Sequence, residues 1–127
     1  IYRKLLECLD MEYIFGEYVN HMKMIITRNL SSACFSIEKS QEALKLNERC
    51  LELAKDSNEG REYHILLSDK ATIILGQIEK GERDEKDIDL VRKYLRQSYH
   101  LAAARGDEKS AEIIKEVWRK NFNKKND

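Results

Sequence analysis

The chain has 127 residues, of which 36% are charged, and its 23 basic and 23 acidic residues give a formal net charge of zero. This balance lacks the basic excess of a nucleic-acid-binding domain, so this segment is not expected to contact nucleic acid directly. No apolar run approaches the 18 or more residues of a membrane span, so no membrane contact is expected either.

The numbers of proline, glycine and cysteine residues limit the fold class and the cellular compartment further. The chain has no proline and only five glycines, which favours helices joined by short polar turns in one domain spanning residues 1–127. Its cysteines, Cys8, Cys34 and Cys50, follow neither a disulfide framework nor a zinc pattern, and free thiols indicate a cytoplasmic protein. Because the chain starts with Ile1 rather than methionine, we expect a fragment that lacks an N-terminal domain.

Apolar residues recur at steps of three and four along the chain, which predicts α-helices. In the first third, Tyr13 to Ile25 fits a helix, and Ser31 to Ser36 is interpreted as a connector. Whether residues 1–9 form a separate short helix stays open. A second helix is predicted from Ile37 to Lys55, closed by a turn at residues 56–60.

The next predicted helix, residues 61–80, is apolar nearly all round and should be the most buried element. Gly81 and a polar run end it. Residues 87–105 then form an amphipathic helix whose apolar stripe is Ile88, Val91, Leu95, Ser98 and Ala102, widened by Tyr99 and Ala103.

A helical hairpin is predicted at the end of the chain. Gly106 offers a left-handed cap, and Asp107 can accept the first amide hydrogen bonds of a last helix. That helix carries Ala111, Ile114, Trp118 and Phe122 on one face, where Trp118 is interpreted as core, with an interface anchor as the alternative. The predicted fold class is therefore all-α, built of antiparallel helical hairpins.

The hairpins show a degenerate internal repeat. The segment Thr72 to Gly76 resembles the first-helix core of a tetratricopeptide repeat, with Thr72 where that repeat usually has tryptophan. Val91, Leu95 and Ser98 fit its second helix; Phe15-Gly16 and Ala43, Asn47 and Cys50 repeat the pattern one hairpin earlier. The step from Ala43 to Val91 is 48 residues, against the usual 34, and the helix-ending proline is absent.

Degenerate hairpins of this kind are similar to the peptide-sensing C-terminal domains of helix-turn-helix transcription regulators from Gram-positive bacteria. Over residues 11–122, the resemblance implies a right-handed superhelix, a concave groove for a short peptide or protein partner, and homodimers. DNA contact would belong to a preceding domain.

The repeat alignment also implies which residues line the groove. The expected set takes one group from each first helix and one from the last helix: Tyr13, Glu17, Asn20, His21, Lys70, Ile73, Gln77, Lys80, Lys109, Glu112, Glu116 and Arg119. Side-chain amides in this set suit the backbone of an extended peptide, and its basic residues suit a carboxylate. The alternative is that these residues are ordinary solvated helix faces.

Catalysis has little support in the sequence. The histidines His21, His64 and His100 are far apart, and Glu17 and His21, at i and i+4, lack the second pair that a metal site would need. No phosphate loop or nucleophile motif is present. We therefore expect no catalytic residues, metal or cofactor; the alternatives to peptide sensing are a structural homodimerisation module or an accessory subunit without a small ligand.

Overall fold

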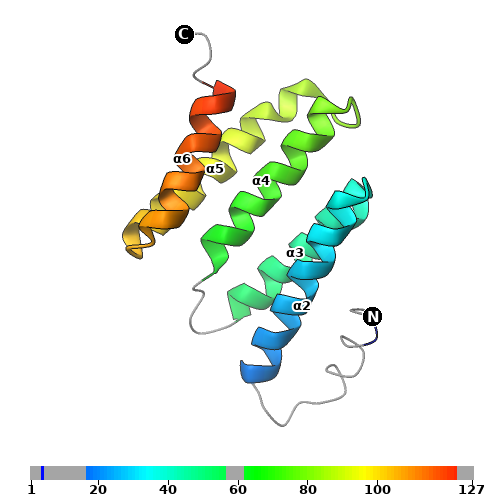
Figure 1. Cartoon of the computed structure of the whole chain (residues 1–127), viewed down its shortest axis with the longest axis vertical. Coiled ribbons are helices and arrows are strands. Elements are labelled where there is room, and N and C mark those ends of the chain that lie inside the picture. Colours follow the sequence, from blue (N-terminus) through cyan, green and yellow to red (C-terminus); the bar gives the residue numbers. More distant parts are fainter. Residues whose placement is uncertain (1–3, 5–16, 57–61, 123–127) are drawn as a thin grey trace. The chain divides into compact units, whose positions relative to one another are not determined.

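The computed structural model describes residues 17–56 and 62–122, together with Lys4, and every regular element in this part of the chain is helical (Figure 1). In chain order these are α2 (Glu17–Ser36), α3 (Ser40–Asp56), α4 (Tyr63–Glu79), the 3-10 turn η1 (Glu85–Asp87), α5 (Ile88–Ala104) and α6 (Glu108–Phe122). The predicted all-α class is confirmed. The helix start at Tyr13, the open question at residues 1–9 and most of the predicted turn at 56–60 lie outside the described residues.

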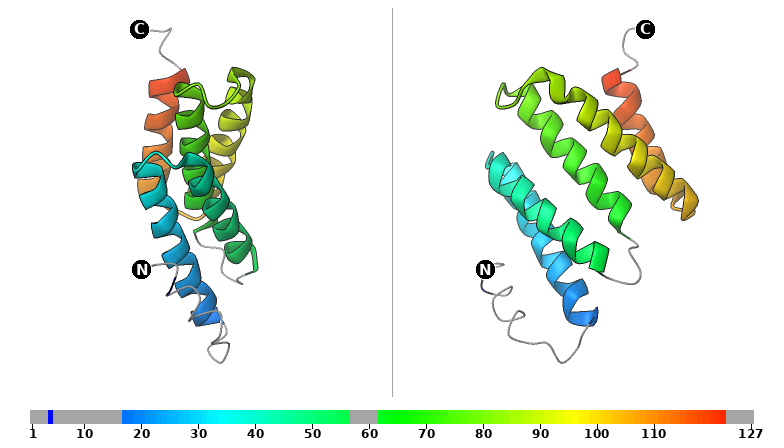
Figure 2. Two further views of the ribbon diagram at one scale, coloured as in Figure 1. Left: turned by 90° about the vertical axis from the view of Figure 1, so that its right-hand side faces the viewer. Right: turned by 180° about the vertical axis from the view of Figure 1, so that it is seen from behind.

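The chain forms two compact units, Ile1–Tyr63 and His64–Asp127, and each is described by itself. In the first, α2 and α3 pack as an antiparallel hairpin (Figure 2). Its buried positions repeat at steps of three and four, the spacing by which two helices interlock along a seam. Most of them are small or polar: Thr27, Ser31 and Cys34 on α2, with Ser40, Ala43, Asn47, Cys50 and Ala54 on α3. Met24, Ile26 and Leu46 are the larger apolar residues buried with them.

The predicted connector at residues 31–36 is wrong, because α2 continues through Ser36. Ser31 is buried, and its hydroxyl donates to the carbonyl of Ala43 on α3 at 2.8 Å. The hydroxyl of Ser36 donates to the carbonyl of Ser32, one turn earlier in the same helix. A run of serines predicts a loop because its hydroxyls compete with backbone hydrogen bonds. Here the hydroxyls of Ser31 and Ser36 instead donate to carbonyls of α3 and α2, and the helix continues.

In the second unit, α4, η1, α5 and α6 follow one another, and each α-helix runs antiparallel to the next (Figures 1 and 2). The predicted stripe of α5 is confirmed at its centre, since Val91, Leu95, Ser98 and Ala102 are buried. Its widening was wrong at Ala103, which is exposed, while Ile88 and Tyr99 are half-buried. As predicted, α4 has the most buried residues of the described helices: His64, Leu66, Leu67, Ala71, Ile73, Ile74 and Gln77.

Three helices end in the same hydrogen-bonded turn, with one residue in the left-handed region. At the end of α5, Gly106 has φ 73°; its amide donates to Ala103, and the amide of Asp107 donates to Ala102. This paired pattern is a Schellman motif, and it confirms the cap predicted at Gly106. Gly81 ends α4 in the same way.

The third of these caps, at the end of α2, has Glu38 where the other two have glycine. Glu38 has φ 65°, and its amide donates to Phe35 while that of Lys39 donates to Cys34. A left-handed backbone costs an L-residue with a side chain roughly 1–2 kcal/mol relative to glycine. The α2–α3 turn therefore stores strain at one position.

Replacing Glu38 with glycine is expected to stabilise the protein by about 0.5–1 kcal/mol, because glycine adopts the left-handed conformation without a Cβ clash. The converse change, Gly106→Ala, introduces the same strain and should destabilise by about 1 kcal/mol. Urea unfolding followed by circular dichroism measures both. A Glu38→Gly protein less stable than wild type would mean that the glutamate side chain contributes more than the strain costs.

In the α2–α3 seam, the hydroxyl of the fully buried Thr27 has no hydrogen-bond partner among the residues that the structure describes. A buried unsatisfied hydroxyl costs about 1–3 kcal/mol, so the near-isosteric change Thr27→Val should stabilise the fold by about 1 kcal/mol. Ser31→Ala, which removes a satisfied hydroxyl from the same seam, is expected to destabilise by about 1 kcal/mol. Urea unfolding measures both changes in the free energy of unfolding. If both substitutions stabilised the protein, or both destabilised it, the hydrogen-bonding states assigned to the two hydroxyls would be contradicted.

Candidate binding pocket on the α5–α6 hairpin

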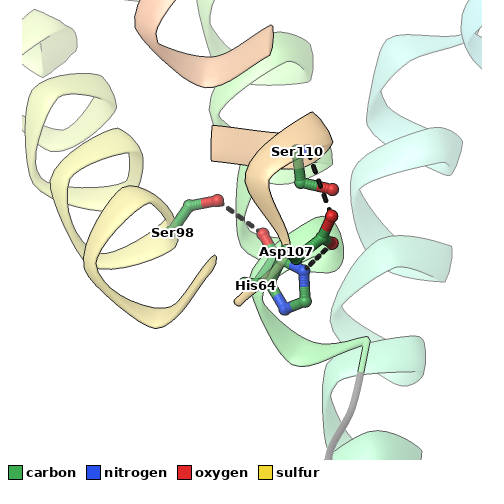
Figure 3. A network of polar contacts seen from close by, with 4 residues as sticks. All are labelled: His64, Ser98, Asp107 and Ser110. Carbon is green, nitrogen blue, oxygen red and sulfur yellow. Dashed lines mark hydrogen bonds and ion pairs between the residues drawn. The ribbon is translucent and has the colours of Figure 1, made fainter. Parts of the chain in front are cut away.

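A polar junction fixes the helices that carry the pocket. The hydroxyl of Ser98 on α5 donates to the backbone carbonyl of His64, near the start of α4, at 2.6 Å. The Nε2 atom of His64 lies 2.8 Å from a carboxylate oxygen of Asp107, immediately before α6 (Figure 3). The other carboxylate oxygen accepts the amide of Ser110 at 3.2 Å. One residue of α4 therefore connects to both α5 and the start of α6.

Asp107 caps α6 as the sequence predicted. Its carboxylate accepts hydrogen bonds from the side chain and backbone amide of Ser110 and from His64, and these bonds lower the pKa of Asp107 from 3.8 to about 2. The charge also lies at the positive end of the α6 dipole. The ionised carboxylate is consequently part of the folded structure at neutral pH.

The junction has the residue types of a hydrolase triad but not its geometry. Ser98 donates to the histidine backbone and not to the ring, so the imidazole cannot take its proton. His64 is only 2% exposed, and its buried Nδ1 has no hydrogen-bond partner in the part of the chain that the structure describes. The arrangement is a structural tie between helices.

On the α5–α6 hairpin, the structure has a cavity of about 360 Å³. Its floor is made by Leu95 and Ile114, which are both buried. The remaining lining side chains are amphipathic or basic: Arg96, Tyr99, His100, Lys115 and Trp118. The volume lies at the lower end of the roughly 300–1,000 Å³ range of small-ligand pockets.

Cation–aromatic contacts order one wall of the pocket. The guanidinium carbon of Arg96 lies 5.5 Å from the ring centre of Trp118, and that of Arg92 lies 4.8 Å from the ring of Phe122. The two aromatic rings are 4.9 Å apart and tilted by 52°. Trp118 is half-buried, so it is not the sealed core residue that its position in the sequence suggested.

Three polar groups of the pocket have no hydrogen-bond partner among the described residues: the guanidinium of Arg96, the phenol of Tyr99 and the imidazole of His100. Arg96 contacts Trp118 through its face, and His100 meets the ring of Tyr99 edge-on with centroids 5.9 Å apart. Arg96 and His100 are exposed and Tyr99 is half-buried, so their polar groups lie at the rim of an otherwise apolar pocket.

The predicted groove residues fall in both units. On α2, Asn20 is half-buried and His21 is exposed, while Tyr13 and the side chain of Glu17 lie outside the described residues. Lys70 on α4 is half-buried, with its amine 4.8 Å from the ring centre of Tyr94, and Lys80 is exposed. That the twelve residues line one groove stays a prediction.

Two residues of the predicted groove are buried, although groove residues are expected to be exposed to a ligand. Ile73 is 4% exposed and Gln77 only 1%, because α4 is apolar on most sides and draws both positions into its buried set. The side-chain oxygen of Gln77 accepts from Arg83 at 2.9 Å. Gln77 is thus a structural residue, and its loss is expected to affect stability.

The four predicted residues of α6 are exposed. Glu112 lies 3.8 Å from Lys115, and Glu116 forms an ion pair and hydrogen bonds with Arg119. That pairing lowers the pKa of Glu116 and raises that of Arg119. Glu112 and Glu116 are thus paired within α6, and whether the four positions line a groove or form a solvated face stays a prediction.

Sequence reasoning missed the pocket on the adjacent face. A signal was present: Arg92, Arg96 and His100 recur at steps of four along α5, which places them in one row. That this row lies over Trp118 and Phe122 depends on how α6 packs against α5, and a single helix pattern does not contain that information.

Comparisons with known proteins were made at three levels, and no family model, curated protein or solved structure matches this chain. Among the described helices, none is long and apolar enough to cross a membrane. The described residues also hold no group of three or more histidine, cysteine or acidic side chains placed to bind a metal ion.

The stabilising effect of Asp107 should depend on pH. Because its folded-state pKa is held at about 2, against 3.8 ordinarily, its charge stabilises the fold above about pH 4, and this contribution is lost as the pH falls toward 2. Asp107→Asn keeps a capping oxygen but removes the charge. The urea midpoint of Asp107→Asn should therefore lie below that of wild type at pH 5, with the gap closing by pH 2.

Asp89→Asn is the matched control, because Asp89 is an exposed carboxylate that pairs with Arg92 outside the junction. Exposed pairs contribute little, so this variant should stay close to wild type across the range. A gap for Asp107→Asn that stays constant from pH 5 to pH 2 would contradict the role assigned to its charge.

Proposed function

We propose that the chain is a helical-hairpin module that binds a peptide or protein partner, and that the α5–α6 pocket accepts an apolar anchor side chain of that partner. One observation carries the proposal: a cavity of about 360 Å³ whose apolar floor is bordered by the side chains of Arg96, Tyr99 and His100. Pockets that accept an aromatic or aliphatic anchor commonly dominate the energy of an interface.

A finer proposal rests on the sequence resemblance. In it the hairpins stack as a tetratricopeptide-like right-handed superhelix and serve as the ligand-sensing and dimerising part of a cytoplasmic bacterial transcription regulator. The antiparallel hairpins α2–α3 and α5–α6 are compatible with it. Ligand binding would then favour one curvature of the stack, which a partner or DNA-binding domain reads.

A structural dimerisation module is the second candidate. Ile113, on α6, is 55% exposed, so this helix presents an apolar side chain that a second copy of the chain can cover. In that case the surface of α6 meets a second copy and no peptide ligand is required.

The test uses the full 127-residue chain and its own fluorescence, because Trp118 is its single tryptophan and lines the pocket. The probe is an acetylated, amidated 15-residue helical peptide without tryptophan, carrying two leucines one turn apart; the control peptide has alanine at both positions. The leucine peptide should change the Trp118 emission saturably, and the alanine peptide should not. Tyr99→Ala, which removes a pocket wall, should weaken binding about tenfold, or about 1.4 kcal/mol.

Tyr94→Ala is the matched control, because Tyr94 is on the same helix but contacts Lys70 rather than the pocket. Its affinity should stay within about twofold of wild type. No saturable change with the leucine peptide would count against the peptide-binding proposal. Concentration-dependent dimerisation in sedimentation equilibrium, together with that result, would favour the dimerisation module.

A further inference from the structure

A basic row and an aromatic row run side by side along the α5–α6 hairpin. Arg92 and Arg96 on α5 lie over Phe122 and Trp118 on α6, with distances of 4.8 and 5.5 Å to the ring centres. His100 extends the basic row by one more turn of α5. A ligand that covers this face meets cationic and apolar groups in parallel, repeated at the spacing of a helical turn.

The two arginines of the row differ in their pairing. Arg92 is neutralised by Asp89, with 2.8 Å between the guanidinium and carboxylate atoms. Arg96 has no carboxylate partner among the described residues, and none of the residues lining the pocket is acidic. Lys115, on the opposite wall, is 3.8 Å from Glu112, a weak exposed pair. The pocket therefore presents an unbalanced positive charge beside an apolar floor.

The position of Arg96 leaves it able to bind an anion. Its guanidinium lies over the ring of Trp118 and is exposed, so a carboxylate can accept two of its N–H donors. Because the contact with Trp118 already restricts the side chain, less rotamer freedom is lost when a ligand binds.

On the basis of the proposed function, we infer that the partner segment is an amphipathic helix with a carboxylate one turn away from its apolar anchor. Side chains at i and i+4 are neighbours on one face of a helix, so such a pair presents an apolar anchor and a carboxylate together to the pocket and to Arg96, which lines it. The anchor enters the pocket between Leu95 and Trp118, while the carboxylate binds Arg96. Such a segment lies along the hairpin as a helix in a groove.

The observations favour this partner over a nucleic acid, the other class that an aromatic and basic surface can bind. Acidic and basic residues balance over the whole chain, so there is no general attraction for phosphate. A single unpaired arginine beside an apolar pocket suits one carboxylate next to one apolar side chain.

The experiment compares three amidated, acetylated helical peptides by titration against Trp118 fluorescence, each carrying the same leucine anchors. The first has a glutamate four residues from each leucine, the second has glutamine there, and the third has alanine for leucine but keeps the glutamates. The glutamate–leucine peptide should bind about tenfold more tightly than the glutamine–leucine peptide. Arg96→Gln should reduce that preference to within about twofold, because the carboxylate then loses its charged partner.

Lys93→Gln is the matched control, since it removes one positive charge from an exposed position of α5 that does not line the pocket. It should leave the tenfold preference intact. The preference should also shrink between about 50 and 500 mM salt, as expected for a partly exposed ion pair.

The outcomes separate this inference from the proposed function. Equal binding of the glutamate and glutamine peptides to wild type would overturn the carboxylate preference while leaving a peptide-binding pocket in place. An unchanged preference in Arg96→Gln would overturn the role of Arg96. Binding of neither leucine peptide would overturn both proposals, and equally tight binding of the alanine–glutamate peptide, or of an oligothymidine probe, would show a general anion surface instead.

Discussion

The packing of the helices in the second unit depends on the hydrogen bonds of His64. The backbone carbonyl of this buried residue accepts a hydrogen bond from the hydroxyl of Ser98, and its ring is hydrogen-bonded to the carboxylate of Asp107. The beginning of α4 is therefore connected to the middle of α5 and to the start of α6. Asp107 in turn caps α6 through Ser110. The direction in which α6 leaves the turn is thereby fixed, and with it the position of Trp118 over α5.

The burial of His64 makes the polar groups of this junction interdependent. A buried imidazole without a partner for Nε2 would carry an unsatisfied donor, and an uncapped α6 would leave its first amides unpaired. Asp107 satisfies both at once and remains ionised because three hydrogen bonds stabilise its charge. Within the described part of the chain, Nδ1 of His64 is buried without a hydrogen-bond partner, which offsets part of the stabilisation that this junction provides.

The α2–α3 hairpin is stabilised by a different means. Its seam is made largely of alanine, serine, threonine and cysteine, which bury little apolar area each but allow the two backbones to approach. Cross-helix bonds from side chain to backbone, such as Ser31 to Ala43 and Cys50 to Met24, then become possible. The same close approach requires a tight turn, which explains why Glu38 adopts a glycine-like conformation between the helices.

Periodicity alone was enough to predict much of the fold. The stripe of α5, the cap at Gly106 and the role of Asp107 were all readable, because each depends on residues within one or two turns of the chain. The run from Ser31 to Ser36 was misread, because the partner that satisfies Ser31 lies on another helix. Local propensity contains no information about such a partner.

The sequence by itself therefore determined the helical class and the positions of most helix ends. It also determined that acidic and basic residues balance, with no excess of either sign. Only the tertiary structure decided which helix faces remain exposed and can bind a ligand. It buried Gln77, which the repeat alignment placed in a groove, and left Trp118 half-buried beneath Arg96 at an apolar pocket. The reason is physical: exposure of a side chain depends on the helices packed against it, and a pocket exists only where two helix faces diverge.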